Sequence, residues 1–388
     1  MFRYLTAGES HGPALVGILD GLPAHIMLDI EAIDATLARR QGGYGRGARM
    51  KIERDRVEFL AGVRGSKTLG SPIAAVIRNR DFENVRSMMD PVNGGGEELT
   101  NPRPGHADYA GALKYRHRDL RNVLERASAR ETAMRVCLGA ICAQFLQSLG
   151  VSTTSYVHRI GDVEADDAQM ETCADVESSE VRCPDPSASA RMCSAIDAAK
   201  AAGDTLGGQF VVRVDGVPAG IGSNRQPETR LDGVLAGALM AMQTVKAVEV
   251  GMGASLSAQR GSRAHDTFAY DGDAVVRGSN RAGGIEGGMS NGEPIFLRVS
   301  VKPIPTLARA LPSVNLHDRR DAAATVVRSD VCVVPAGAIV GEAMVRLALT
   351  GPILEKYGGD CIEETVDNFQ RANIAAARLF ARNDVSGP

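Results

Sequence analysis

Short apolar runs separated by glycine- and asparagine-rich turns recur along the chain, and they constrain its fold more than any other feature. Their alternating or β-branched residues predict strands at 2–7, 14–21, 56–63, 71–79, 207–218 and 293–304. Turns of this composition favour antiparallel pairing of the strands that they join.

Helical segments lie between these strands. Capping residues and apolar periodicity predict helices from Asp29 to Gly42, over 128–149, 188–203 and 231–246, and in the C-terminal tail 361–388. Because strands and helices alternate without a regular βαβ rhythm, the predicted fold class is α+β.

The helix predicted over 128–149 has the clearest pattern. Its apolar stripe consists of Met134, Leu138, Ile141, Phe145 and Leu149. Ser128 and Glu131 have the S-x-x-E spacing of a capping box, which predicts that the helix begins at Ser128. Arg130 then falls in the first turn, where a cation is disfavoured unless an anion binds beside it. The alternative is an Arg130 that faces solvent or pairs with Glu131 or Asp119.

Two other segments bear on the organisation of the chain. The pattern Gly-x4-Gly-x-Pro-Ile occurs at 65–73 and again at 287–295, each time before a predicted strand. It indicates either a duplicated hairpin or two similar turns. The polar region 160–190 is typical of a solvated excursion from the core.

Length, charge and cysteine usage exclude several classes of protein. A length of 388 residues allows two or three domains or one large one, and the net charge of −3 does not indicate a polycation that binds nucleic acid or membrane surfaces. The seven cysteines form no CxxC pair, which favours reduced thiols and no structural zinc. The N-terminal stretch lacks an apolar signal region, and no run of 18 apolar residues occurs. We expect a soluble, cytoplasmic protein.

The segment GESHG, residues 8–12, fits the G-x-S-x-G pattern of a hydrolase nucleophile. Such an elbow needs a helix after the serine and an oxyanion-hole loop before it. Only nine residues precede Ser10, and a strand is predicted after it. A serine hydrolase therefore remains a weak alternative to an ordinary or ligand-binding hairpin loop.

Anion binding in this chain must depend on arginines, because neither a P-loop nor a Rossmann glycine motif occurs in register. The arginines gather beside glycine-rich or helix-start sequence, at positions 39, 40, 46 and 49, then 116, 118, 121, 126 and 130, and finally 328. A non-catalytic protein that binds polyanions such as RNA is the second alternative.

Three side chains are candidates for proton transfer. His11 lies in the opening turn, and His106 lies in NPRPGHADY, where prolines fix an irregular backbone. Histidine titrates near neutral pH and suits acid–base work. Asp330, two residues from Arg328 in an apolar stretch, is either a buried ion-pair partner or a base. The five other histidines (25, 117, 158, 265 and 317) have less distinctive settings, and no spacing indicates a metal.

With these residues in view, the chain resembles the chorismate synthase family. The segments that carry the resemblance are 8–23, 125–141 and 328–344, supported by GGYGRGARMKIE, RPGHADY, GGIEGGMSNGEPI and KPIPT. The resemblance runs from residue 2 to about 350. It implies a single domain over 1–388, a layered sandwich of helices between antiparallel sheets, and a homotetramer.

The activity implied by the resemblance is a 1,4-elimination of phosphate from 5-enolpyruvylshikimate 3-phosphate to give chorismate. It requires reduced FMN, which is not consumed overall. NADPH enters only as a source of electrons for the flavin, and the sequence leaves open whether this chain or an external flavin reductase uses it. A substrate that carries a phosphate and two carboxylates accounts for arginines gathered around glycine loops in a mildly acidic protein.

Site roles follow from matching positions in the family motifs. Implied catalytic residues are His11, His106 and Asp330, with His106 near flavin N1, His11 at the departing phosphate and Asp330 near flavin N5. Implied substrate contacts are Ser10, Arg46, Arg49, Arg130 and Arg328. Implied cofactor contacts are Arg40, Arg46, Arg126, Ala127, Ser128, Gln243, Thr244, Gly287, Lys302, Pro303, Ile304, Pro305, Thr306 and Arg328. Gln243-Thr244 departs from the Asn-Ala that the family often has there.

Overall fold

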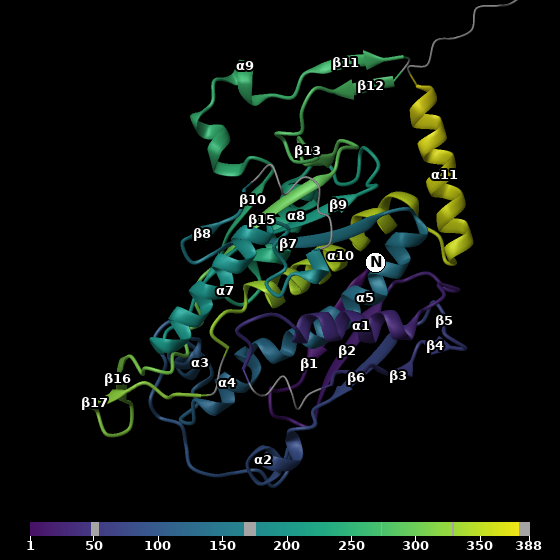
Figure 1. Cartoon of the computed structure of the whole chain (residues 1–388). Helices are drawn as coiled ribbons and strands as arrows, with labels where there is room; N and C mark the ends of the chain where they lie inside the picture. The colour runs from purple at the N-terminus through teal and green to yellow at the C-terminus, as the bar shows by residue number, and fades with distance from the viewer. Residues whose placement is uncertain (48–53, 167–175, 273, 328–329, 380–388) are drawn as a thin grey trace, which may run out of the picture.

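The computed structural model describes residues 1–47, 54–166, 176–272, 274–327 and 330–379. One of its two large sheets comes from the N-terminal part of the chain (Figure 1). Its strands, in spatial order, are β1 (Arg3–Ala7), β2 (Ala14–Asp20), β6 (Ile73–Arg78) and β3 (Glu58–Ala61). All neighbours in this sheet pair antiparallel, as predicted.

The second sheet comes from the C-terminal part of the chain. Its strands, in spatial order, are β10 (Val245–Val250), β15 (Ile295–Val301), β9 (Gly208–Asp215), β7 (Ser152–Ile160) and β8 (Val163–Glu164). These pairs are also antiparallel. The α+β class is therefore confirmed.

The two sheets are built in the same order. β1, β2, β3 and β6 occupy the positions that β7, β9, β10 and β15 occupy in the second sheet. A small hairpin precedes the last strand of each set: β4 (Val63–Arg64) with β5 (Lys67–Thr68), and β13 (Ile285–Glu286) with β14 (Met289–Ser290). The repeated Gly-x4-Gly-x-Pro-Ile sequence thus marks a hairpin that occurs twice, once in each half.

A long helix follows each set of strands. α5 (Thr132–Ser148) packs against β2 and β6, α10 (Val334–Tyr357) packs against β7 and β9, and the two helices pack against each other. A Cβ atom at Gly139 in α5 would lie only 2.6 Å from Cα of Ala343 in α10. The contact between the two halves therefore includes helix backbone, with no room for an added methyl group.

α10 is long and apolar enough to cross a membrane, yet 72% of its apolar window is buried inside the protein. Its apolar character is accounted for by contacts with α5, β7 and β9. The helix also carries the fully buried Glu342, whose carboxylate accepts hydrogen bonds from Ser155 at 2.6 Å and Arg346 at 2.8 Å.

The remaining elements connect or cover this core. The helices are α1 (Ile30–Gln41), α2 (Phe82–Met89), α3 (Asp108–Tyr115), α4 (Arg121–Ala127), α7 (Pro186–Ala201), α8 (Leu231–Met240), α9 (Gly261–Ala264) and α11 (Ile362–Arg378). Two further hairpins are β11 (Phe268–Asp271) with β12 (Ala274–Arg277) and β16 (Pro312–Asn315) with β17 (Arg320–Ala323). Short 3₁₀ helices cover 129–131, 176–178, 227–229 and 253–258.

Most predicted elements are confirmed, but several observed elements were not predicted, among them the strand β7 and the helices α2, α3, α4 and α10. Asp29 caps α1 by accepting a hydrogen bond from the Ala32 N–H at 3.0 Å, and Gly42 follows its last residue. The sequence prediction missed β7, whose serines and threonines hide the strand pattern. Its Tyr156, Val157 and Ile160 are nevertheless buried between neighbouring elements.

Several predictions of extent were wrong. The helix predicted over 231–246 ends at Met240, and β10 begins at Val245. The region 160–190 is not a uniform solvated excursion: Val181, Arg182 and Cys183 are buried, and the Arg182 carbonyl accepts a hydrogen bond from Val157 N–H at 2.8 Å. Residues 167–175 lie outside the described residues. The helix predicted from Ser128 begins instead at Thr132, after a 3₁₀ turn.

The burial of the cysteine thiols leads to a testable prediction about their reactivity. It raises the pKa of Cys142 and Cys332 to about 12, whereas Cys361 is partly exposed. We expect iodoacetamide at about pH 8 to label Cys361 in the folded protein well before Cys142 or Cys332, because the thiolate is the reactive form. Peptide mass spectrometry over time measures the order, with urea-unfolded protein as control. Equal labelling rates in the folded protein would contradict the burial.

Candidate active site

A cavity of about 710 Å³ lies where α5 and α10 both begin. Segments distant in sequence form its wall: the β1–β2 loop, the end of α1, residues 103–107, the start of α5, the α8–β10 connection, residues 302–306 and the start of α10. The N-terminus of a helix is the positive end of its dipole. Two long helices therefore direct their positive ends at one cavity, which suits an anionic ligand.

Most of the predicted site residues line this cavity. They are Ser10, His11, Arg40, Arg46, His106, Ala127, Ser128, Arg130, Gln243, Thr244, Lys302, Ile304, Pro305, Thr306 and Asp330. Arg49 and Arg328 lie outside the described residues. The fold thus brings together side chains that are up to 320 positions apart in the sequence, from Ser10 to Asp330.

Three predicted residues are not part of the cavity wall. Arg126 donates hydrogen bonds to the carbonyls of Gly8 at 3.0 Å and Thr6 at 2.9 Å, and so fastens the β1–β2 hairpin to α4. Pro303 lies between residues that line the cavity. Gly287 lies in the turn of the β13–β14 hairpin, in the left-handed conformation with φ of 60°.

His11 is held by a carboxylate that the sequence analysis did not single out. Its Nδ1 lies 3.0 Å from both oxygens of Glu125, and its backbone N–H donates to Glu125 Oε2 at 2.8 Å. The Glu125 side chain is only 3% exposed, whereas that of His11 is 24% exposed. A carboxylate on Nδ1 fixes the ring orientation and leaves Nε2 for other partners. No spacing in the sequence pairs residue 11 with residue 125.

His106 belongs to a second pair of the same kind. Its Nδ1 lies 2.6 Å from Asp108 Oδ1, and Arg103 Nε donates to Asp108 Oδ2 at 2.8 Å. Burial raises the pKa of Asp108, but the hydrogen bonds from His106 and Arg103 outweigh it, so this pKa lies well below its usual range. Asp108 is therefore a carboxylate that orients His106. Both partners flank His106 in NPRPGHADY, so this group was visible in the sequence.

Asp330 forms an ion pair, one of the two roles expected from the sequence. It lies 3.0 Å from Arg46 Nη1 and accepts a hydrogen bond from Gly47 N–H at 2.6 Å. Its side chain is 18% exposed and lines the cavity. An ion pair and a role as base are compatible here, because the carboxylate still borders the cavity.

Arg40 has an unusual environment at the cavity wall. It donates to Thr132 Oγ1 and to the Ala129 carbonyl, while its Nη1 makes no hydrogen bond among the described residues and lies 4.0 Å from Asp55. Burial and then the charge of Arg46 lower the Arg40 pKa to about 9. A buried guanidinium with an unsatisfied donor at a cavity favours binding of an anion there.

Arg130 does not face solvent, as one alternative held, and it does not lie in the first turn of the helix; binding of an anion beside it stays a prediction. Arg130 precedes α5, is buried, and donates from Nη1 to Asp55 Oδ2 at 2.7 Å and from Nε to Asn79 Oδ1 at 3.0 Å. Glu131 does not close a capping box, since its carboxylate accepts from Arg135 Nε at 2.9 Å and from Gln243. Arg130 still lines the cavity, where its charge acts on whatever enters.

Ser10 has a setting unlike that of a nucleophile elbow. It is 1% exposed, its Oγ accepts a hydrogen bond from Ser128 Oγ at 3.1 Å, and β2 rather than a helix follows it. The hydrogen bond joins the β1–β2 loop to the turn before α5. The hydrolase alternative therefore lacks the strand–turn–helix geometry on which it depends.

Thr244 marks backbone strain beside the cavity. This β-branched residue has a φ of 70°, a conformation that L side chains rarely adopt. Its carbonyl accepts from Lys302 N–H at 2.9 Å, which keeps residues 302–306 next to the α8–β10 connection. Such strain persists where the surrounding structure fixes it, and it gathers at functional sites.

Fold and cavity together are typical of an enzyme site for an anionic small molecule, since two carboxylate-held histidines and several cationic side chains line one cavity. The sequence profile of chorismate synthase matches residues 2–354. Relatives named chorismate synthase include those of Desulforudis audaxviator, 52% identical over 96% of this chain and 97% of the relative, and Symbiobacterium thermophilum, 51% identical over 95% and 97%.

Comparison with solved structures also finds chorismate synthase. A crystal structure of chorismate synthase aligns with a TM-score of 0.79 and 38% identity, covering 97% of this chain and 99% of the other. The chain belongs to the chorismate synthase family. This family consists of carbon–oxygen lyases that catalyse the final step of the shikimate pathway and require a reduced flavin.

Proposed function

We propose that the cavity at the start of α5 and α10 is where this chain eliminates phosphate from 5-enolpyruvylshikimate 3-phosphate to give chorismate. In this reaction a C–O bond to phosphate and a C6–H bond break, and a new double bond forms without net oxidation. The observation that carries the proposal is the presence of two carboxylate-held histidines and several cationic side chains around one cavity.

The substrate carries a phosphate and two carboxylates, so its binding site must supply positive charge. We assign this role to Arg46, Arg49, Arg130 and Arg328, with Ser10 as a hydrogen-bonding residue. The buried positions of Arg46 and Arg130, whose side chains are 11% and 3% exposed, support the assignment because charge attraction is stronger away from water. Fixed guanidinium forks also orient a polyanion for elimination.

The two histidines have separate proton-handling roles in this proposal. Glu125 orients the His11 ring through Nδ1, and His11 is assigned to the departing phosphate. Asp108 holds Nδ1 of His106, which is assigned to the N1 side of the flavin. Asp330 assists removal of the C6 proton near flavin N5. The ion pair with Arg46 keeps Asp330 in place without withdrawing it from the cavity.

The cavity wall fits a flavin phosphate and an aromatic ring system. It offers Nη1 of Arg40, which has no hydrogen-bond partner within the described part of the chain, the ammonium of Lys302 and the apolar side chains of Met242, Val327 and Val340. We propose reduced FMN as the flavin; when bound, it supplies an electron that helps to expel phosphate and takes it back afterwards. The residues assigned to hold it include Arg40, Ala127, Ser128, Lys302, Ile304, Pro305 and Thr306.

Other parts of the proposal rest on family resemblance. Arg126, Pro303, Gly287 and the divergent pair Gln243-Thr244 keep their assignment as cofactor contacts, and NADPH serves only to reduce the flavin, directly or through an external reductase. A single domain, a layered sandwich, a cytoplasmic homotetramer and the absence of nucleic-acid or membrane partners complete it. The layering is supported by packing of α5 on β2 and β6 and of α10 on β7 and β9.

Arg46→Lys should weaken substrate binding by roughly tenfold or more, because a point charge replaces a planar fork that also pairs with Asp330. The dissociation constant measured by anaerobic fluorescence titration with substrate tests this. Arg78→Lys is the control, since Arg78 forms an exposed ion pair with Glu58 outside the cavity wall. An unchanged constant in the Arg46 variant would place Arg46 outside the substrate site.

The deciding experiment mixes purified protein with 5-enolpyruvylshikimate 3-phosphate and chemically reduced FMN without oxygen. We expect chorismate absorbance and phosphate release to appear in equal amounts, and only with reduced flavin. Oxidised FMN is the control. Flavin binding without either product would contradict the proposed reaction while leaving family membership intact.

A further inference from the structure

Three potential metal ligands meet at the junction of the N-terminal sheet and the C-terminal helix. His25 follows β2, while Cys361 and Glu363 lie at the start of α11. The ligand atoms of the three side chains all lie within 4.8 Å of one another, and His25 Nδ1 lies 3.2 Å from Glu363 Oε2.

Backbone hydrogen bonds hold the two segments in this arrangement. Ala24 N–H donates to the Asp360 carbonyl at 2.9 Å, and Ile362 N–H donates back to the Ala24 carbonyl at 2.9 Å. His25 has a φ of 70°, and its N–H donates to the Thr68 carbonyl at 2.9 Å. A non-glycine residue held at positive φ shows that the surrounding contacts determine its conformation. The ligands are therefore placed by the fold and not only by contact with each other.

The donor set is one that zinc prefers. Imidazole nitrogen, thiolate sulfur and carboxylate oxygen are its usual ligands, and a tetrahedral site places ligand atoms roughly 3.4 to 3.8 Å apart, given its bond lengths. The present spacing of up to 4.8 Å is brought into this range by small side-chain rotations. We propose that His25, Cys361 and Glu363 bind Zn²⁺, with water as the fourth ligand.

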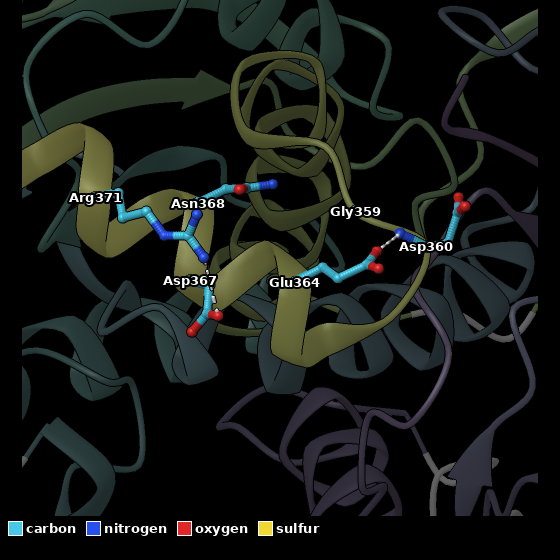
Figure 2. Close-up of a pocket in the computed structure, with 6 residues that line it drawn as sticks. All are labelled: Gly359, Asp360, Glu364, Asp367, Asn368 and Arg371. Carbon is cyan, nitrogen blue, oxygen red and sulfur yellow. Dashed lines mark hydrogen bonds and ion pairs between the residues drawn. The ribbon is translucent and has the colours of Figure 1, made fainter.

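The carboxylates next to the His25–Cys361–Glu363 cluster belong to a different surface cavity. Asp360, Glu364 and Asp367 line a separate surface cavity of about 430 Å³, shown in Figure 2. There Glu364 accepts from Asp360 N–H at 2.9 Å, and Asp367 pairs with Arg371 at 3.3 Å. These contacts engage the carboxylates of Glu364 and Asp367 with protein partners, and the residues that line that cavity include no histidine or cysteine. The zinc site is therefore assigned to the histidine–cysteine–glutamate cluster.

The position of the proposed zinc site indicates a structural role for the ion. Two of the three ligands follow residue 354, where the family profile ends. Zn²⁺ cross-links α11 to the loop after β2, joining positions 336 and 338 residues apart (25 to 361 and 25 to 363). It stabilises the docking of α11, which runs along the outside of the molecule in Figure 1. This role is independent of the elimination reaction.

The test uses the chelator-treated full-length protein titrated with Co²⁺, which substitutes for Zn²⁺ and reports its ligands by absorbance. We expect a saturable sulfur-to-cobalt charge-transfer band that Zn²⁺ displaces. Cys361→Ser should abolish this band and weaken Zn²⁺ binding at least about tenfold. His25→Asn should weaken Zn²⁺ binding by a similar factor, since asparagine tolerates the positive φ and only the ligand is lost.

Two variants serve as matched controls. Cys193→Ser removes another partly exposed thiol, and Glu364→Gln removes a neighbouring carboxylate, so both should keep the band. Hydrogen exchange should slow on Zn²⁺ addition in 23–27 and 361–379 and not in α5. A band that persists in Cys361→Ser, or the lack of saturable binding in the micromolar range, would overturn the zinc site.

Discussion

Replacing His106 with alanine is expected to lower turnover by roughly 10²- to 10⁴-fold, the usual contribution of a positioned proton donor. His11→Ala should have an effect of the same order. Each ring lines the cavity, and a buried carboxylate fixes each Nδ1. Anaerobic turnover at saturating substrate and reduced flavin measures the loss, so weakened binding does not mimic it.

Two further variants separate chemistry from positioning. Asp108→Asn and Glu125→Gln keep the histidines but remove the carboxylates that orient them, so each should lower turnover less than loss of the ring. They should also change the pH profile of turnover, which a purely structural role would leave unmoved. His317→Ala is the control, because His317 does not line the cavity. Near-wild-type turnover in His106→Ala would remove that residue from the mechanism.

Glu342→Gln is expected to lower the free energy of unfolding by about 3–5 kcal/mol, as in other buried ion pairs that lose one partner. Glu342 is fully buried in α10 and lies 2.8 Å from Arg346 Nη2 and 3.2 Å from Arg39 Nη2. The amide turns N–H donors toward guanidinium donors and leaves Arg346 without a counter-charge. Urea unfolding followed by circular dichroism gives the difference.

The control for this variant is Glu58→Gln. Glu58 pairs with Arg78 at 3.3 Å on the surface, where both side chains are at least half exposed. Exposed pairs of this kind contribute at most about 1 kcal/mol, because water and salt screen them. Equal changes in the free energy of unfolding of the two variants would show that burial of Glu342 does not increase its contribution to stability.

The sequence predicted the elements whose signals are local. Asp29 and Gly42 bound α1 where capping chemistry places its ends, and six strand runs appear as strands. It failed where tertiary contacts decide the outcome. β7 has a polar sequence but pairs with β9 on one edge and β8 on the other. The segment around Arg182 is buried and accepts a hydrogen bond from Val157, a contact that no local sequence pattern indicates.

The contacts of the site also divide into those that follow from the sequence and those that only the fold shows. The grouping of Arg103, His106 and Asp108 follows from neighbouring positions in the sequence. By contrast, the pairs His11–Glu125 and Arg130–Asp55 join residues 114 and 75 positions apart, so only the folded chain shows them. The predicted capping box at Ser128 was wrong because Glu131 finds partners in Arg135 and in Gln243, which comes from the second half of the chain.

The close contact between Gly139 and Ala343 has a mechanical consequence. Where helix backbones touch without an intervening layer of side chains, neither helix can slide or tilt without a clash. The two halves of the protein therefore move as one block, and the cavity at the ends of their long helices cannot open by hinging between them. Ligand entry and release must occur through the connecting segments that form the cavity rim.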